Sequence, residues 1–500
     1  MSDPRATEAT PSRRPTLARE LGILGLAATG ICSMLGAGIN VVPFMIQRSV
    51  PGIGPWVLLA FLIAVIPAML AALCYAAMSA AMPRSGGSYV FVSRSVSPYL
   101  GFVASFSQWL GLSVVIGVVA YVLIPFFRDI AIALDAPGAA AVFENGPSRV
   151  GLALALLWAA AWVNVRGVKF YERVLVPLMF LMFVGGAIII VTGLTHDVAD
   201  YATAAATRGI TLPAKPAAPL TAGVLLPAVV LLFASFIGFD AIAQAGGEAR
   251  TPSRNLPLAI GIAIGTLGLY YVLFTYAAYH AVPWYHVADL AATEDITIPG
   301  MLAVLLSPTW SVIIIVGAAI ALANDLPAML LSVSRLMFAW AEDGVFPRTI
   351  TRIHGTYRTP WIAIVASAAM ASVGVVGSHL AGDFFLGIDI MVIAMLVNYL
   401  LVCLSVVLLP RRNPELATRM TLLNGARGRA VAGVAVAVLG ALLVVQVIKD
   451  LSAPVEAWYF RSTWLWLIVM ALGSAVFLIK WRTLAVDGDP RAIYRELPRQ

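Results

Sequence analysis

Charged residues are scarce in this chain. Asp, Glu, Lys and Arg make up only 11% of its 500 residues, while apolar residues make up 61%. Soluble domains carry roughly 25% charged residues, so the composition excludes an ordinary soluble protein. The mean hydropathy is +0.92, and apolar runs of about 20 residues, long enough to cross a bilayer, recur throughout. We therefore predict an all-α polytopic membrane protein embedded in a lipid bilayer.

Residues typical of catalytic and metal sites are also few. Cys32, Cys74 and Cys403 fall inside apolar runs, too far apart for a metal site, and are interpreted as packing residues. The glycine pairs at Gly86 and Gly246 lack a phosphate-loop context. The histidines lie mostly in or beside loops, without metal-ligand or triad spacing: His196, His280, His286, His354 and His379. We expect that the protein is not an enzyme and that it binds no metal and no cofactor.

The net charge of +7 is spread along the chain. If both termini and the even-numbered connections are cytoplasmic, 24 of the 32 Lys and Arg residues lie inside and 7 outside, with Arg335 near an inner helix end. This is the positive-inside bias, and no single loop holds enough charge for nucleic-acid binding. Residues Met1–Arg19 lack a signal-peptide core. We predict a multi-pass protein of the cytoplasmic membrane with both termini inside.

Twelve apolar segments can be counted along the chain. Each is predicted to form a transmembrane helix, with approximate bounds Leu21–Ile46, Trp56–Met82, Leu100–Leu134, Val150–Val165, Leu175–Leu194, Ala222–Ala245, Leu258–Val282, Thr309–Ala341, Trp361–Gly377, Phe384–Leu409, Val431–Val447 and Thr463–Ile479.

The first and sixth segments both contain small residues that tolerate interrupted backbone, and the third and eighth are unusually long. The break of the first segment recurs in the sixth, five spans later. Because five is an odd number, the two halves of the chain cross the membrane in opposite directions. This pattern predicts a five-plus-five inverted repeat with two helices appended. The predicted parts are a cytoplasmic tail (1–20), a ten-helix transport core (21–410, with repeats 21–195 and 222–410), helices 11 and 12 (411–481) and a cytoplasmic tail (482–500). The longest outer connection, His196–Thr221, is predicted to be a surface loop.

The run Gly36-Ala37-Gly38 places small residues at the middle of the first segment. Backbone freed from helical bonding cannot face lipid, so a break here belongs in a protein-lined cavity. The half-helix beginning near Gly38 would direct unpaired N–H groups at an anion such as a carboxylate. Alternatively, the small residues only permit close helix packing.

The sixth segment carries a matching break. Ser235 and Gly238 would supply it, Phe236 would form an apolar wall, and Asp240 places a charge at membrane depth. An acid there is costly and is rarely kept without a use. Asp240 could orient helix ends, bind a cation or carry a proton; alternatively, it is a structural acid bonded to nearby backbone.

The connection after the sixth segment contains Glu248, Arg250 and Arg254. We interpret these residues as a cytoplasmic salt-bridge latch, with a solvated turn as the alternative.

Four motifs in order resemble the amino acid–polyamine–organocation (APC) permeases. They are GAGI in the first segment, MPRSGGSYVFV (Met82–Val92), SFIGFD followed by E-x-x-x-P-x-R-x-x-P (within Leu231–Ile260), and SRLMFAWAEDGVFPRTITRIHGTYRTP (Ser334–Pro360). The resemblance implies a leucine-transporter-type fold with broken helices 1 and 6. It also implies an amino acid whose carboxylate binds at Gly36-Ala37-Gly38, beside Ile39. The amino group would meet carbonyls around Met34 and at Ser235–Phe236.

The sequence departs from the family pattern in several places. Asn40 and Ala234 replace aromatic residues that are common in the family. The change at Ala234 would widen the pocket or move gating to Phe233 or Phe236. An acid common in the second segment is absent. The fifth segment lacks the lysine that proton-coupled members often carry, and Met179 and Met182 occupy its middle.

Asn324 and Asp325 lie near the middle of the eighth segment, with Pro327 two residues on. Proline frees a helical carbonyl, and a buried acid is expensive unless it faces water or a cation. We predict that Asp325 is a coupling or amine-binding group; alternatively, the pair is hydrogen-bonded to a neighbouring helix. Asp389 is a weaker candidate, nearer the outer surface.

The sequence thus predicts an amino acid transporter that works by alternating access, most simply as a proton symporter. A polyamine or organic-cation transporter, or an exchanger of the same fold, is the alternative, and a non-transporting receptor is a third. A sodium site would use hydroxyls such as those of Ser332 and Ser334.

Overall fold

The computed structural model describes residues 17–381, 384–454, 457–486, 494 and 496–498. Most of the two predicted cytoplasmic tails, including residues 1–16 and 487–493, lies outside these residues.

Ten helices in the described part of the chain are long and apolar enough to cross a membrane. They are α4 (Val57–Ala81), α6 (Pro98–Ala133), α8 (Gly146–Val165), α9 (Val168–Thr195), α13 (Pro252–Ala281), α16 (Pro308–Glu342), α17 (Trp361–Ala381), α18 (Phe384–Arg412), α20 (Gly425–Ser452) and α21 (Ser462–Val486). The prediction of an all-α, multi-pass membrane protein is confirmed. The long third and eighth segments appear as α6 and α16, of 36 and 35 residues.

The first and sixth apolar segments are each divided. The first forms α1 (Ile23–Cys32), α2 (Ala37–Asn40) and α3 (Val42–Ser49). The sixth forms α11 (Ala222–Phe233), the 3-10 turn η2 (Ala234–Phe236), α12 (Asp240–Gln244) and the 3-10 turn η3 (Gly246–Glu248). Main-chain groups therefore lose their helical partners at two places in the apolar part of the chain.

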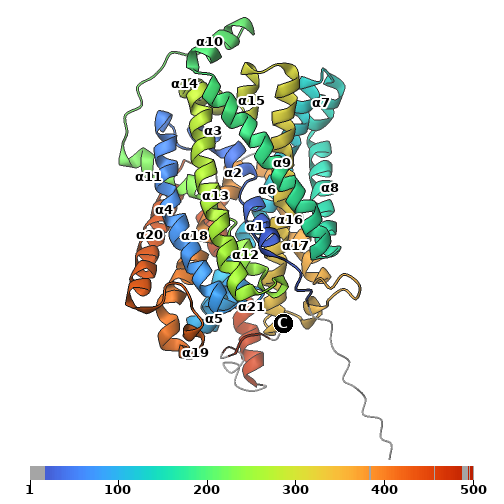
Figure 1. The fold of residues 1–500 in the computed structure, drawn as a ribbon, viewed down its shortest axis with the longest axis vertical. Helices are drawn as coiled ribbons and strands as arrows, with labels where there is room; N and C mark the ends of the chain where they lie inside the picture. The colour runs from blue at the N-terminus through green and yellow to red at the C-terminus, as the bar shows by residue number, and fades with distance from the viewer. Residues whose placement is uncertain (1–16, 382–383, 455–456, 487–493, 495, 499–500) are drawn as a thin grey trace, which may run out of the picture.

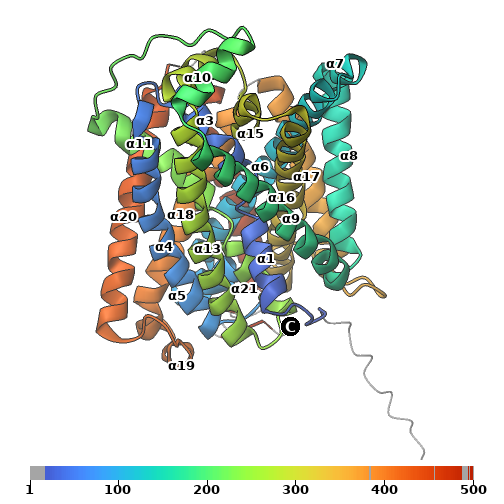
Figure 2. The same ribbon diagram turned by 45° about the horizontal axis from the view of Figure 1, so that its top comes forward.

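Short helices lie at the two ends of the bundle (Figures 1 and 2). We call the end with α7 (Pro137–Glu144), α10 (Val198–Thr207), α14 (Trp284–Thr293) and α15 (Ile298–Leu302) the upper face. The end with α5 (Gly87–Ser95) and α19 (Pro414–Thr418) is the lower face. The remaining 3-10 turns are η1 (Gly54–Trp56), η4 (Ala303–Leu305), η5 (Arg348–Thr351) and η6 (Trp458–Phe460).

The connection His196–Thr221 is not a simple loop, because it contains α10. The Asp197 carboxylate caps this helix by accepting hydrogen bonds from the N–H groups of Ala199 and Asp200. The Asp200 carboxylate in turn accepts a hydrogen bond from the N–H of Asp197. This reciprocal arrangement is a capping box.

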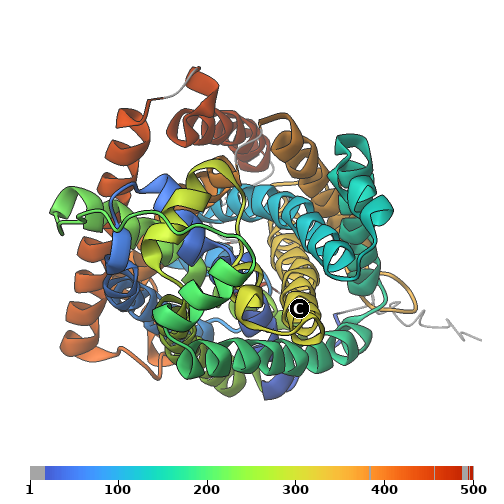
Figure 3. The same cartoon turned by 90° about the horizontal axis from the view of Figure 1, so that it is seen from above.

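Three helices form the interior of the bundle. Most residues in the apolar parts of α6, α16 and α18 are buried inside the protein, whereas only about a quarter of those in α20 and α21 are buried. Seen from above, α6 and α16 run through the middle while α20 and α21 lie at the periphery (Figure 3). Helix α18 packs against α6 on one side and against α20 on the other. The interior helices and the two broken segments therefore enclose the centre of the molecule.

The break in the sixth segment predicts a sharp sensitivity at Gly238. Its φ is +139°, and an added methyl group would overlap the carbonyl of Ser33. We expect Gly238→Ala to destabilise the protein by about 1–3 kcal/mol, the range for a residue held in an unfavourable backbone conformation. The thermal unfolding midpoint in detergent measures this. Gly261→Ala is the matched control, because this glycine of α13 has open space around it. Equal midpoints for the two variants would contradict the prediction.

Candidate functional site

The break in the first segment spans Ser33–Gly36. Three carbonyls of this region accept hydrogen bonds from side chains of the protein. The Tyr271 hydroxyl donates to the Met34 carbonyl (2.5 Å), the Asn40 amide to Gly36 (3.1 Å) and the Ser235 hydroxyl to Gly38 (2.9 Å). Local side chains therefore satisfy main-chain groups that lipid could not.

The break in the sixth segment faces the first one. After η2, Ile237 is extended (φ −76°, ψ 128°) and Gly238 takes a positive φ before α12 begins. The absence of a side chain at Gly238 lets its backbone approach the carbonyl of Ser33. Together with the bond from Ser235 to Gly38, this contact joins the two breaks.

A cavity of about 40 Å³ lies between the two breaks. Its polar lining comes from Ser33, Ser235 and Asp325. The wall also contains apolar side chains from three interior helices, among them Val115, Val118 and Val119 of α6, Met329 of α16, and Ile388 and Met391 of α18. The cavity thus combines one acid and two hydroxyls with a broad apolar surface.

Asp325 lies at the middle of α16 with 2% of its surface exposed. An added methyl group at Gly36 would overlap its Oδ2, so the carboxylate lies directly against bare main chain of the first break. Its Oδ1 has no hydrogen-bond partner among the described residues. Buried polar atoms are nearly always paired, so this oxygen is a candidate ligand-binding group.

Asn324 behaves differently from its neighbour. Its amide lies within hydrogen-bond distance of the carbonyl of Leu175 (3.1 Å) and of the sulfurs of Cys32 (3.1 Å) and Met182 (3.4 Å). It therefore connects α16 to α9 and α1, and it does not line the cavity. Asn324 therefore lies where the first, fifth and eighth segments meet.

Asp240 is fully buried but lies outside the cavity lining. Its Oδ1 accepts from the Tyr399 hydroxyl (2.6 Å) and the Gly238 N–H (3.2 Å), and its Oδ2 accepts from the amide of Gln108. The Gln108 carbonyl oxygen in turn accepts from Ser88, Gln244 and Asn398. Asp240 is thus surrounded by donors that fix α12 against α6 and α18.

The remaining predicted residues divide into two groups. Met34, Gly38 and Ser235 line the cavity. Ile39 and Phe236 are buried beside it, Phe236 against the rings of Phe61 and Tyr271. Gly36 lies against the Asp325 carboxylate, Gly238 allows the close backbone contact of the second break with Ser33, and Ala37 is the first residue of α2. Binding of substrate by these residues remains a prediction.

Comparison with known proteins agrees with this architecture. Residues 21–476 match the family described as "Amino acid permease". The chain belongs to the amino acid permease family, within the APC superfamily. It is therefore a membrane transport protein and not an enzyme.

Several relatives of this permease are named for different substrates. It is 25% identical to a methylthioribose transporter of Bacillus subtilis over 95% of this chain and 96% of that protein. It is 24% identical to the branched-chain amino acid permease BcaP of the same bacterium, over 82% of this chain and 84% of the relative. Cationic amino acid transporter 4 of Mus musculus is 26% identical over 71% of this chain, which spans 54% of that longer protein.

Below the cavity, the permease is closed by a buried ion pair. Arg335 lies ten residues beyond Asp325 on α16, or about 15 Å along a helix. Its guanidinium forms two hydrogen bonds with Glu248 (2.6 and 3.0 Å), and the two side chains are 1% and 0% exposed. The N–H groups of Glu20 and Leu21 donate to the Glu248 carbonyl. The predicted latch through Arg250 and Arg254 is corrected, because the partner of Glu248 is Arg335 of α16.

A second buried pair lies at the lower face of the permease. Arg94 of α5 binds Asp343, which follows α16, at 2.6 and 3.0 Å. The described residues near the C-terminus cover this pair: the ring of Tyr494 lies 4.8 Å from the Arg94 guanidinium, and the Tyr494 hydroxyl meets that of Tyr89 at 3.2 Å. Arg84 donates to the carbonyl of Pro498 (2.9 Å). The described C-terminal residues therefore pack over this second ion pair.

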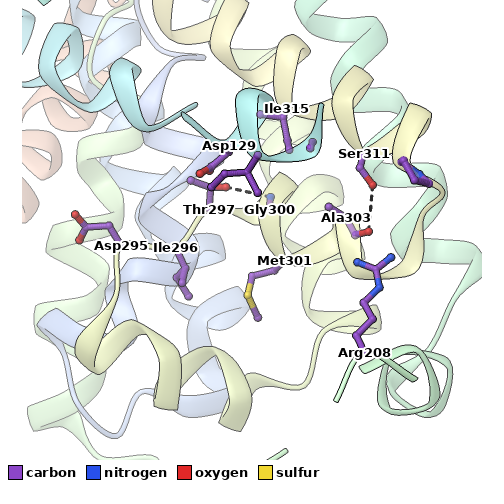
Figure 4. Close-up of a pocket in the computed structure, with 13 residues that line it drawn as sticks. Asp129, Arg208, Asp295, Ile296, Thr297, Gly300, Met301, Ala303, Ser311 and Ile315 are labelled. Atoms are coloured by element: carbon purple, nitrogen blue, oxygen red, sulfur yellow. Dashed lines mark hydrogen bonds between the residues drawn. The ribbon is translucent and has the colours of Figure 1, made fainter. Parts of the chain in front are cut away.

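The upper face carries a larger hollow of about 490 Å³ between the end of α6, α15, η4 and the start of α16 (Figure 4). Its two acids are paired, Asp129 with Arg128 and Asp295 with Arg48. It contains none of the predicted site residues. This hollow is distinct from the cavity at the helix breaks.

The lower ion pair generates a stability prediction. Arg335→Met would leave Glu248 charged, buried and unpaired, which costs about 3–5 kcal/mol. We expect a large fall in the thermal unfolding midpoint in detergent, partly recovered by adding Glu248→Gln. Lys169→Met is the control, because its pair with Glu20 is solvent-exposed and contributes little. A fall no larger than that of Lys169→Met would contradict the role of the buried pair.

Proposed function

We propose that this permease carries amino acids across the cytoplasmic membrane by alternating access, driven by the proton gradient. The observation that carries the proposal is the meeting of two interrupted apolar helices at a buried cavity. Such breaks in two halves of a chain are typical of the substrate sites of secondary transporters. Family membership and transporter relatives support the same function.

The proposed architecture has twelve spans and an inverted repeat. The ten long helices and the two divided segments together account for the twelve. Two features support the repeat: the first and sixth segments are both broken, and the third and eighth, α6 and α16, are both long and interior. Leu21, before α1, donates to the Glu248 carbonyl and accepts from the Arg250 N–H at the lower face. The carbonyl of Ala218, before α11, accepts from the Trp56 indole at the upper face. The first and sixth segments therefore start from opposite faces.

Alternating access requires a closure on each side of the site. We assign the lower closure to the pairs Arg335–Glu248 and Arg94–Asp343, which join α16 to η3 and to α5. Opening toward the cytoplasm would separate these pairs and let water reach their charges. The basic residues near α5 and α19 support a cytoplasmic lower face.

Proton coupling needs a group that can gain and lose a proton within the membrane. The two buried carboxyls near the breaks, Asp240 and Asp325, are the candidates, since the fifth segment provides no lysine. The donors around Asp240 are Gln108 of α6, Tyr399 of α18 and the Gly238 N–H of the second break. Because the second break borders the cavity, a change in the charge of Asp240 would affect the substrate site.

A polyamine or other organic cation is the second candidate substrate. The observation in its favour is the unpaired carboxylate of Asp325 on the cavity wall. Exchange of internal for external substrate is an alternative mode of the same machinery.

Uptake into proteoliposomes tests the proposed function. Purified protein is reconstituted and given labelled amino acids or amines, with an acidic exterior, with no gradient, or with a sodium gradient. We expect accumulation only with the acidic exterior and its loss on adding a protonophore, relative to protein-free vesicles. Accumulation that follows sodium would contradict proton coupling alone. No accumulation or exchange of any panel member under any condition would contradict the transporter assignment.

A further inference from the structure

Side chains of the protein already occupy three main-chain acceptors at the first helix break. The carbonyls of Met34, Gly36 and Gly38 already accept hydrogen bonds from Tyr271, Asn40 and Ser235, all side chains of this chain. Among the side chains on the cavity wall, Oδ1 of Asp325 and the hydroxyl of Ser33 are buried without a hydrogen-bond partner. Asp325 is the one acidic side chain in the described lining, so a positively charged group entering the cavity would meet its carboxylate there.

No protein group neutralises Asp325. The described residues that line the cavity include no Lys, Arg or His. The titratable groups facing Asp325 are the Cys32 thiol of α1 and the Tyr271 hydroxyl of α13, and neither carries a positive charge. Arg335, further along α16, is already bound to Glu248. Because a buried, unpaired carboxylate is costly, Asp325 is neutralised either by a proton or by a cation that occupies the site.

The rest of the described cavity lining offers no acidic side chain to a second positive charge. The three valines of α6, Met329 of α16, and Ile388 and Met391 of α18 present only methyl, methylene and thioether groups. Asp240, the other nearby acid, is outside the lining and holds its own donors. A ligand with a second cationic group would leave that charge unpaired against an apolar wall, a strongly rejected arrangement.

We propose that the transported molecule carries a single ammonium group next to a compact aliphatic or thioether chain, as in leucine, valine or methionine, and that Asp325 binds the ammonium group. This inference rests on the proposed transport function and narrows its substrate. It excludes dibasic amino acids and polyamines, and it makes the apolar wall the part of the site that selects the side chain.

Competition on the unmodified protein tests the substrate class. Binding of labelled leucine to purified protein is competed with methionine, lysine, putrescine and 4-methylpentanoate, which is leucine without its ammonium group. We expect methionine to compete, and the other three to be at least ~100-fold weaker than leucine, since each leaves a buried charge unpaired. Competition by lysine, putrescine or 4-methylpentanoate as strong as that of leucine would overturn the inference.

The outcome separates this inference from the proposed function. If proteoliposomes transport lysine or putrescine but not leucine, the permease function stands and the substrate inference is wrong. If no panel member binds or moves, the proposed function itself is wrong.

Substitution of the acid gives a second test. We expect Asp325→Asn to weaken leucine binding by ~10–100-fold, the range for one charge-assisted hydrogen bond. The matched control is Asp389→Asn, which removes an acid of α18 that binds Lys449 and lies outside the cavity. We expect its leucine affinity to stay within ~3-fold of the unmodified protein.

Size-exclusion profiles and unfolding midpoints show whether each variant is folded. If Asp325→Asn binds leucine normally and loses only its pH dependence, Asp325 carries protons and the inference is overturned. If the variant does not fold, the competition series on the unmodified protein decides the question.

Discussion

The structure depends on one constraint: main-chain groups released inside a membrane must find partners within the protein. Two apolar segments lose helical bonding at the same depth, and each break is satisfied by the other or by neighbouring helices. Ser235 of the second break bonds to Gly38 of the first, and Tyr271 of α13 bonds to Met34. The broken segments are therefore stable only as a pair enclosed by other helices. The cavity is a consequence of that enclosure, and its location follows from where the two helices end.

The two buried acids show how environment divides similar residues into different roles. Asp240 is surrounded by three donors and contributes to the positions of α6, α12 and α18. Asp325 has no such partners among the described residues and faces the cavity. A carboxylate whose oxygens all accept hydrogen bonds from the protein stabilises the arrangement of helices, whereas one with an unpaired oxygen can still bind a solute. The difference lies in the neighbours, since the two side chains are chemically identical.

Much of the fold could be predicted from the sequence, because the apolar runs, the small residues at the two helix breaks, and the lengths of α6 and α16 are local features. The first break was placed slightly too late: it spans Ser33–Gly36, and Gly38 already lies in α2. The partners of the buried acids could not be predicted in this way. Gln108 and Tyr399 lie 132 and 159 residues from Asp240, and Arg335 lies 87 residues from Glu248. The residues of the cavity wall could not be identified from the sequence either, since Val115, Val118 and Val119 do not differ from the residues on other faces of an apolar helix. Only folding brings these residues together, and α10 was missed because a short capped helix resembles a polar loop.

Both ends of the described chain are attached to the lower closure. Glu20 and Leu21 bond to Glu248, while Tyr494 and Pro498 contact Tyr89, Arg94 and Arg84. An affinity tag or fluorescent fusion joined close to either of these segments would thus disturb the elements that separate in the proposed opening of the lower face. The connection between α10 and α11 on the upper face runs free of these elements (Figure 1). That connection is the better place to insert a purification handle or reporter when turnover is to be measured.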